Sequence, residues 1–256
     1  MASPGPWSRR SVLIAGALGV TSLAGCGDDP NQVRGNLSTR HWPGAKPRWR
    51  MALPREGRAA GLVVSLHGRG GDADSAFDLG LADHVDRTRL AVVSVDGGNG
   101  YWHARRDGSD TGAMVREDLI PLALARAGLP ATTALVLHGW SMGGFGALLL
   151  ASDLGAGRVK AVVAVSAALW TSGSETPAGA YDDREDFERH SIFGRTDALR
   201  QVPVRLDCGT SDPFIRANRL LATKLPRAVA HFGPGGHDAG YWRGRLADEL
   251  DWAAAR

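Results

Sequence analysis

The pentapeptide Gly139-Trp140-Ser141-Met142-Gly143 constrains this chain more than any other segment, because it places a G-x-S-x-G pattern in the context that the pattern requires. It follows the apolar run 134–137, typical of a buried strand, and opens the stretch 144–150, typical of a helix. Such a sharp turn strains the backbone of the serine, and glycines on either side let neighbouring backbone approach closely. The pattern predicts that Ser141 presents its hydroxyl at the end of a strand as a candidate nucleophile.

A serine nucleophile needs a base and a group that orients the base, and the chain supplies both downstream. The run 202–206 is typical of a strand, and Asp212 follows it in a polar turn. A second strand-like run, 228–232, is followed by a glycine-rich loop that contains His237. The order Ser141, Asp212, His237 is the order found in the α/β-hydrolase fold.

Two other residues compete for these roles. Asp207 lies within the expected strand, where its side chain points along the sheet face, whereas Asp212 lies past the strand end in a turn that can reach a histidine loop. His231 has strand-like neighbours, which makes it a less mobile base than His237. We therefore expect Asp212 and His237 to form the pair.

Acyl transfer also needs an oxyanion hole, built from the backbone N–H of the residue after the nucleophile and of an earlier strand-to-helix loop. Met142 supplies the first group. The strand-like run 61–66 leads into the glycine-dense loop 67–71, whose backbone can approach a bound carbonyl. We expect the Arg69 N–H to be the second donor.

Three segments together resemble the esterase D-like esterase family, whose relatives include feruloyl esterases and mycolyltransferases. They are 66–71 (Leu-His-Gly-Arg-Gly-Gly), 139–147 (Gly-Trp-Ser-Met-Gly-Gly-Phe-Gly-Ala) and 235–237 (Gly-Gly-His). The resemblance covers roughly residues 58–255. It implies a serine esterase that forms an acyl-enzyme and uses no cofactor. Acyl transfer of the mycolyltransferase type uses the same triad in these relatives and is the alternative.

Residues 1–26 have the features of an export signal. Arg9 and Arg10 form a twin-arginine pair, and the apolar stretch that follows is too short to span a bilayer as a stable helix. The segment ends in Leu-Ala-Gly-Cys, which resembles the bacterial lipobox. We expect Cys26 to carry lipid and to anchor the exported protein at the outer face of the cell membrane; secretion with an incidental cysteine is the alternative.

The rest of the chain divides into a polar segment, 27–47, expected to be a flexible tether, and a catalytic domain, 48–256. Within the domain, strand-like and helix-like segments alternate: 62–66, 74–87, 90–95, 111–127, 134–137 and 161–165. This alternation predicts an α/β fold with a mostly parallel central sheet and helices on both faces. The long polar connection 167–200 is expected to form a small cap insertion.

Composition argues against nucleic-acid binding. The formal charge of +3 falls to +1 once Arg9 and Arg10 leave with the signal. The chain has two cysteines, and neither belongs to a metal-binding pattern. We expect Cys208 to be a buried free thiol, and we expect no metal.

Ligands of open α/β sheets bind at the carboxyl ends of the strands, and several aromatic or histidine residues are expected near that edge. The candidates for substrate contact are Tyr101, Trp102, His103, Trp170, Tyr241 and Trp242. Their alternative role is to pack the domain. The expected partner is a small-molecule or glycolipid acyl ester, met at a membrane through the lipid anchor. A surface-binding lipoprotein without catalysis is the alternative from another class.

Overall fold

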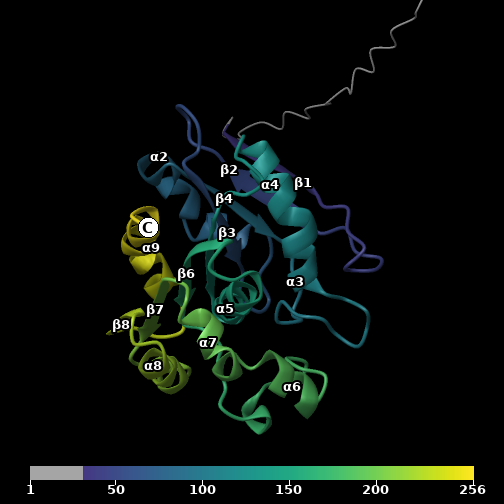
Figure 1. The fold of residues 1–256 in the computed structure, drawn as a ribbon, viewed down its shortest axis with the longest axis vertical. Helices are drawn as coiled ribbons and strands as arrows, with labels where there is room; N and C mark the ends of the chain where they lie inside the picture. The colour runs from purple at the N-terminus through teal and green to yellow at the C-terminus, as the bar shows by residue number, and fades with distance from the viewer. Residues whose placement is uncertain (1–30) are drawn as a thin grey trace, which may run out of the picture.

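One sheet of eight strands organises the fold of residues 31–256, the part of the chain that the computed structural model describes (Figure 1). The strands are β1 Gln32–Asn36, β2 Arg48–Ala52, β3 Gly61–Leu66, β4 Leu90–Val95, β5 Leu135–Trp140, β6 Val159–Val165, β7 Val204–Gly209 and β8 Val229–Gly233. Their order in the sheet is β1-β2-β4-β3-β5-β6-β7-β8. The six strands from β4 to β8 pair in parallel, and β1 and β2 add an antiparallel edge.

Helices cover both faces of the sheet, which explains why every residue of β3, β4 and β5 is buried. The helices are α1 Ser75–Asp78, α2 Val85–Thr88, α3 Thr111–Met114, α4 Ile120–Arg126, α5 Met142–Leu154, α6 Arg184–His190, α7 Thr196–Leu199, α8 Ile215–Lys224 and α9 Ala239–Ala254. One hydrophobic core joins a face of the sheet to α4, α5 and α8, and a second joins the other face to α2 and α9. Figure 1 shows α2 and α9 on the side of the sheet opposite α3 and α4. The predicted fold class is confirmed.

Two of the expected helices are interrupted. The segment 74–87 divides into α1, a 3-10 turn at Leu81–His84, and α2, because Gly80 takes a left-handed conformation (φ 97°) that ends α1. The segment 111–127 contains a π-helical turn at Val115–Leu119, directly before the turn that holds Pro121. The wider turn lets the helix continue past a residue that lacks an N–H.

The expected flexible tether needs correction, because β1 lies inside it. Each residue of β1 pairs with β2, from Gln32 opposite Ala52 to Asn36 opposite Arg48, so this segment is an edge strand of the sheet. Leu37 directly after it is buried in the core. A polar, glycine-containing composition indicated flexibility, but the hydrogen bonds of the β1–β2 ladder order the segment.

The connection between β6 and β7 contains the expected insertion at 167–200. It holds α6, α7 and two short 3-10 turns, Gly173–Glu175 and Ile192–Gly194. Arg105 fastens it to the loop after β4, since its Nη2 donates to Oδ1 of Asp182 at 2.9 Å and its Nη1 donates to the carbonyl of Gly179 at 2.7 Å. We call residues 167–200 the cap segment.

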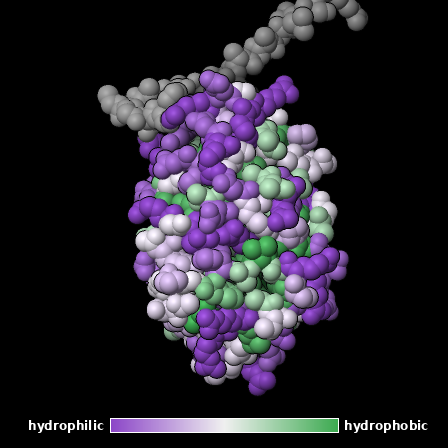
Figure 2. All heavy atoms as spheres, turned by 90° about the vertical axis from the view of Figure 1, so that its left-hand side faces the viewer, coloured by the Kyte–Doolittle hydropathy of each residue, from purple (hydrophilic) through white to green (hydrophobic). Residues whose placement is uncertain are grey.

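The surface seen from the side of α2 and α9 is mostly hydrophilic, with smaller apolar areas between the polar groups (Figure 2). Among residues 31–256, the large hydrophobic side chains that are exposed are Leu220 on α8 and Val229 on the edge strand β8. None of the helices described is both long enough and apolar enough to cross a membrane. The twin-arginine pair, the apolar stretch after it and Cys26 lie outside the described residues.

Candidate active site

Ser141 lies in the turn between β5 and α5, with φ 56° and ψ −122°. Residues other than glycine rarely take this conformation, and it costs energy that the surroundings must offset. The Ser141 carbonyl accepts hydrogen bonds from the N–H groups of Phe145 (3.1 Å) and Ala168 (2.9 Å), and its N–H donates to Val165 O (2.9 Å). Backbone hydrogen bonds to α5, β6 and the start of the cap segment therefore hold the serine in its turn.

Both glycines of the pentapeptide are required by close backbone approach. A Cβ on Gly143 would collide with the carbonyl groups of Leu66 and His67. A Cβ on Gly139 would collide with the carbonyl of Gly143. The pattern places glycine where the end of β3 passes directly beside the serine turn.

His237 meets Ser141 from the loop between β8 and α9. Its Nε2 lies 2.9 Å from the Ser141 Oγ, and its Nδ1 lies 2.8 Å from Oδ2 of Asp212. A carboxylate only accepts hydrogen bonds, so Nδ1 carries the proton and Nε2 faces the hydroxyl with its lone pair. Asp238 fixes the end of this loop, because its side chain accepts a hydrogen bond from the Tyr241 N–H and caps α9.

Asp212 lies just past β7 and is buried beneath the histidine. Burial disfavours its charged form, but hydrogen bonds from His237, from the Phe214 N–H and from Ser166 outweigh burial and lower the pKa of the carboxyl below its ordinary value. The Phe214 N–H donates to Oδ1 at 2.8 Å, which leaves Oδ2 for the imidazole. The carboxylate is thus both charged and fixed in direction.

Asp207, the other acid considered, does not reach the histidine. It is fully buried in β7, and its Oδ2 accepts a hydrogen bond from Nε of Arg205 at 2.8 Å. The other histidine considered, His231, lies exposed on the edge strand β8. The structure brings together Ser141, His237 and Asp212.

The two expected oxyanion donors come from the segment after the serine and from a loop that packs against it. Met142 is the first residue of α5, so its N–H has no acceptor within the helix. Arg69 follows Gly68, where a Cβ would lie 3.3 Å from the Ser141 Cβ, so this loop packs against the serine. His67 shapes the loop: its Nδ1–H donates to Gly68 O (2.7 Å), and its Nε2 accepts from the Gly97 N–H (2.9 Å). Burial lowers the pKa of His67, which favours this neutral form.

Comparison with known proteins agrees with this arrangement. Residues 44–253 match the model of the family described as "Putative esterase". The chain belongs to this esterase family. It is therefore an ester-hydrolysing enzyme, and the esterase part of the sequence-based resemblance is confirmed. No curated protein matches the chain at a significant level.

Solved structures of hydrolases share its fold. The fluorophosphonate-binding serine hydrolase F of Staphylococcus aureus has a TM-score of 0.75 at 17% identity, covering 87% of this chain and 98% of its own. An S-formylglutathione hydrolase from Agrobacterium tumefaciens has a TM-score of 0.75 at 17% identity, covering 88% and 95%. A ferulic acid esterase has a TM-score of 0.73 at 21% identity, covering 88% and 97%. The fold of this esterase is that of the α/β hydrolases.

A row of aromatic rings leads away from the His237 imidazole of the esterase. Phe214 packs edge-on against His237, with ring centroids 5.2 Å apart, and Trp170 packs against Phe214 at 5.5 Å. Tyr101 extends the row, at 5.6 Å from Trp170. The sequence indicated Tyr101 and Trp170 but not Phe214, whose position two residues after Asp212 was the available signal.

Trp102 and His103 are buried, which favours packing, their alternative role, over contact with substrate. The Trp102 indole fills the space above Gly97 and Gly146, where a Cβ would collide with it. His103 lies with Nδ1 at 3.0 Å from Ala104 O and Nε2 at 3.1 Å from Ala180 O. Both side chains pack the loop after β4 against α5 and the cap segment.

Tyr241 and Trp242, the last two candidates, lie on the first turn of α9. The Tyr241 ring covers Gly235, and its hydroxyl is buried. Trp242 packs edge-on against His237 with centroids 5.1 Å apart, and its Nε1 donates to the Ser166 Oγ at 3.0 Å. Both residues hold the histidine loop in place.

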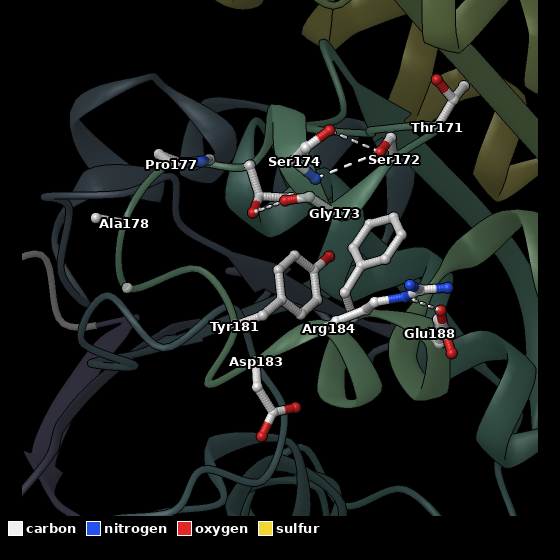
Figure 3. A pocket seen from close by; sticks show the side chains of 13 residues that line it. Thr171, Ser172, Gly173, Ser174, Pro177, Ala178, Tyr181, Asp183, Arg184 and Glu188 are labelled. Carbon is white, nitrogen blue, oxygen red and sulfur yellow. Dashed lines mark hydrogen bonds and ion pairs between the residues drawn. The ribbon is translucent and has the colours of Figure 1, made fainter.

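Two hollows open on the cap side of the site. A groove of about 500 Å³ runs between the cap segment and α8, and it is lined by Leu169, Trp170, Glu175, Phe214, Ala217 and Leu220, among others. A second hollow of about 750 Å³ lies within the cap segment, between residues 171–179 and α6. Figure 3 shows Tyr181 beside this hollow, with Ser172 and Ser174 opposite it. Phe187 also lines the hollow. Thr171 lines both hollows, so they adjoin.

Within residues 31–256, one group has the side chains and spacing to ligate a metal: His103, Asp186 and His190. Its arrangement fits hydrogen bonding better than ligation. Carbonyl oxygens lie beside both ring nitrogens of His103, and burial lowers its pKa and favours the neutral ring. The nitrogen that carries the proton therefore donates to one carbonyl, and the lone pair of the other faces an oxygen rather than an open site. The rings of His103 and His190 stack 4.2 Å apart, so their in-plane lone pairs do not converge on one point.

Proposed function

We propose that Ser141, His237 and Asp212 form the catalytic triad of a serine esterase that hydrolyses carboxylic acyl esters through an acyl-enzyme. The observation that carries the proposal is the pair of hydrogen-bond distances at His237, 2.9 Å to the serine hydroxyl and 2.8 Å to the carboxylate. A strained serine facing an imidazole that a buried carboxylate orients is the arrangement that activates a hydroxyl for attack.

In the first half of the reaction, the Ser141 Oγ attacks the ester carbonyl while His237 Nε2 takes the hydroxyl proton. Asp212 holds the Nδ1–H and stabilises the imidazolium. The N–H groups of Met142 and Arg69 donate to the oxyanion of the tetrahedral intermediate. The carbon–oxygen bond to the alcohol then breaks, and His237 returns its proton to the leaving oxygen.

In the second half, a water molecule attacks the acyl carbon of the acyl-enzyme and gives a proton to His237. The bond to the Ser141 Oγ breaks, the proton returns to the serine, and the acid leaves. An alcohol in place of water would produce a new ester, which is the acyltransferase alternative.

The test uses two small reagents that react with the serine and need few contacts with the rest of the protein. They are the ester p-nitrophenyl acetate and a covalent fluorophosphonate probe. The wild-type protein should hydrolyse the first and be labelled by the second at Ser141. Ser141→Ala should lose both, whereas Ser174→Ala, which removes an exposed hydroxyl of the cap segment, should keep both. Labelling and turnover that survive in Ser141→Ala would reject the proposed nucleophile and, with it, the function.

For the natural substrate, we propose an acyl ester of a cell-envelope or extracellular carbohydrate or lipid. Two features support it: the export features of residues 1–26, and the hollow in the cap segment, which combines hydroxyl groups with the rings of Tyr181 and Phe187 and adjoins the groove lined by Phe214. Acetylated sugars supplied with and without an alcohol acceptor, with free acid and transferred ester both measured, would separate hydrolysis from transfer. Turnover of aryl esters alone would remove the envelope substrate.

We also propose that lipid on Cys26 holds the protein at the outer face of the membrane. Two acyl chains bind a membrane stably, whereas a single chain binds only marginally. Cys26→Ser should move the protein from the membrane fraction to the soluble fraction or stop its processing. An unmodified Cys26 in the mature membrane-bound protein, observed by mass spectrometry, would contradict the proposal.

A further inference from the structure

Ser166 lies one residue past β6, fully buried, with φ 48°. A left-handed conformation normally favours glycine, so a serine here needs a reason. Its N–H donates to the Asp207 carbonyl at 2.7 Å, which fixes the backbone without using the side chain. The hydroxyl is therefore the feature that distinguishes this residue from a glycine.

The hydroxyl connects Trp242 to Asp212. The indole Nε1–H of Trp242 donates to the Ser166 Oγ at 3.0 Å. An indole N–H only donates, so the serine oxygen accepts and its own hydrogen is free for another acceptor. Ser166 is also among the groups that lower the pKa of Asp212, so its hydroxyl lies near the carboxylate. A carboxylate only accepts, so the donors run in one direction: indole N–H to serine O–H to carboxylate.

We propose that Ser166 and Trp242 are positioning residues that hold the Asp212–His237 pair through this relay. The proposal rests on the proposed function, since it concerns the same triad. The relay supplies Asp212 with a third donor, besides the Phe214 N–H and the His237 imidazole. Three donors keep a buried carboxylate ionised and fix the direction of the oxygen that receives the Nδ1–H.

Trp242 acts on the other member of the pair as well. Its ring meets the His237 imidazole edge-on, at 5.1 Å between centroids and an interplanar angle of 89°. The loop before His237 is glycine-rich, and α9 begins directly after it, capped by Asp238. The bond from Trp242 to Ser166 therefore ties the first turn of α9, and the histidine next to it, to the end of β6.

Two further groups lie near the relay. The Cys208 thiol of β7 contacts both Ser166 and Asp212, and burial, followed by the charge of Asp212, raises its pKa to about 12. It is therefore an uncharged thiol at neutral pH and a weaker acceptor than the carboxylate. The positive charge of Arg219 on α8 offsets part of this rise in the pKa of Cys208. The Ser166 proton accordingly goes to Asp212.

The experiment compares Ser166→Gly, Ser166→Ala and Trp242→Phe in the full-length protein. Glycine suits the positive φ and removes only the hydroxyl, and alanine keeps the Cβ. Phenylalanine keeps a ring beside His237 and removes the N–H. The readouts are the rate of fluorophosphonate labelling of Ser141 and kcat/KM for p-nitrophenyl acetate, each against pH, together with Tm.

All three variants should lose about 10-fold in both rates, because the Ser166 variants remove a donor to the charged carboxylate and Trp242→Phe removes the bond that orients the Ser166 hydroxyl. The acid limb of each pH profile should shift, because this limb reports the ionisation of the coupled Asp212–His237 pair and each variant weakens the relay that ends on its carboxylate. The double variant Ser166→Gly/Trp242→Phe should lose little more than either single variant, as expected for one relay. Trp252→Phe removes an indole N–H of α9 that has no partner among residues 31–256, and it should change neither profile.

Ser166→Gly with wild-type rates and an unmoved acid limb would overturn the proposal. A lower Tm without any shift of the acid limb would also overturn it, because that result describes a residue that only supports the fold. Failure of the proposed function looks different: the wild-type protein would be labelled without hydrolysing any ester, and the labelling profiles would still test the relay.

Discussion

Arg205 and Asp207 form an ion pair within β7, with Arg205 Nε 2.8 Å from Oδ2 of Asp207 and both side chains buried. This ion pair engages Asp207, the acidic residue nearest in sequence to the candidate catalytic acid, Asp212. It therefore separates two aspartates, five residues apart, into a structural group and a group that faces the histidine. The separation can be tested directly.

We expect Asp212→Asn to lower kcat on the order of 10⁴-fold, because an amide at this position favours the wrong tautomer of His237. Asp207→Asn should leave kcat for folded protein nearly unchanged and lower the free energy of unfolding by roughly 3 to 5 kcal/mol, since Arg205 would remain buried without its partner. Initial rates and urea unfolding of the two variants measure this. A larger loss of kcat in Asp207→Asn would reverse the assignment.

The base can be tested with a matched pair of histidines. We expect His237→Ala to cost about as much as Ser141→Ala in kcat, because triad members act as a unit. His231→Ala should keep nearly wild-type kcat, since this side chain is exposed on β8. Loss of turnover in His231→Ala with activity retained in His237→Ala would show that His237 is not the base.

The buried His138 should make the fold less stable as the pH becomes acidic. It is fully buried on β5, its Nδ1 lies 3.0 Å from Ser65 Oγ, and its Nε2 lies 3.5 Å from Glu249. Burial lowers its pKa from 6.5 to about 4. The unfolded chain therefore binds a proton that the folded chain rejects. This contribution to stability is complete above pH 6.5 and is lost as the pH falls toward 4, by on the order of 3 kcal/mol. Unfolding of His138→Gln between pH 7 and 4 should show a smaller loss than the wild type; equal slopes would contradict the assignment.

Glu249 should change the stability of the fold with pH in the opposite direction to His138. Burial first, and the nearby Asp207 second, raise its pKa well above 4.5, so the folded protein keeps a proton that the unfolded chain releases. Stability from this group is present at acid pH and is lost as the pH rises from about 4.5 through the folded value. We expect Glu249→Gln to gain Tm relative to the wild type as the pH is raised from 4 to 8. Glu188→Gln, at an exposed glutamate of α6, should show no such trend.

The groove between the cap segment and α8 should select substrates by size. Ala217 lines it, and a larger side chain there would fill the space beside Trp170 and Phe214. We expect Ala217→Trp to raise KM for bulky esters about 10-fold or more while leaving p-nitrophenyl acetate nearly unaffected, because the small ester does not need the groove. Lys224→Trp, at the exposed end of α8, is the control. If Ala217→Trp changed KM equally for both kinds of ester, bulky esters would bind outside this groove.

The chain order of strand, helix and turn was enough to predict the α/β fold and the positions of Ser141, Asp212 and His237. These features are local: a buried strand is apolar over several residues, a tight turn needs glycine, and the acid and base follow strand ends. The preference for Asp212 over Asp207 followed from the same reasoning, because a residue past a strand end can reach a neighbouring loop. The sequence also located the cap segment as an unusually long connection.

Contacts between distant segments decided the rest. β1 is ordered by its ladder with β2, which its polar composition does not reveal. Trp102 is buried and Trp170 faces the groove, although both are tryptophans near strand ends, because only packing determines which side of a loop meets solvent. Trp242 was expected beside substrate, yet its N–H meets a serine 76 residues earlier in the chain. The sequence by itself determined which residues can do chemistry and in what order they occur; the tertiary structure decided which of them meet, because that depends on how helices and strands far apart in the chain pack together.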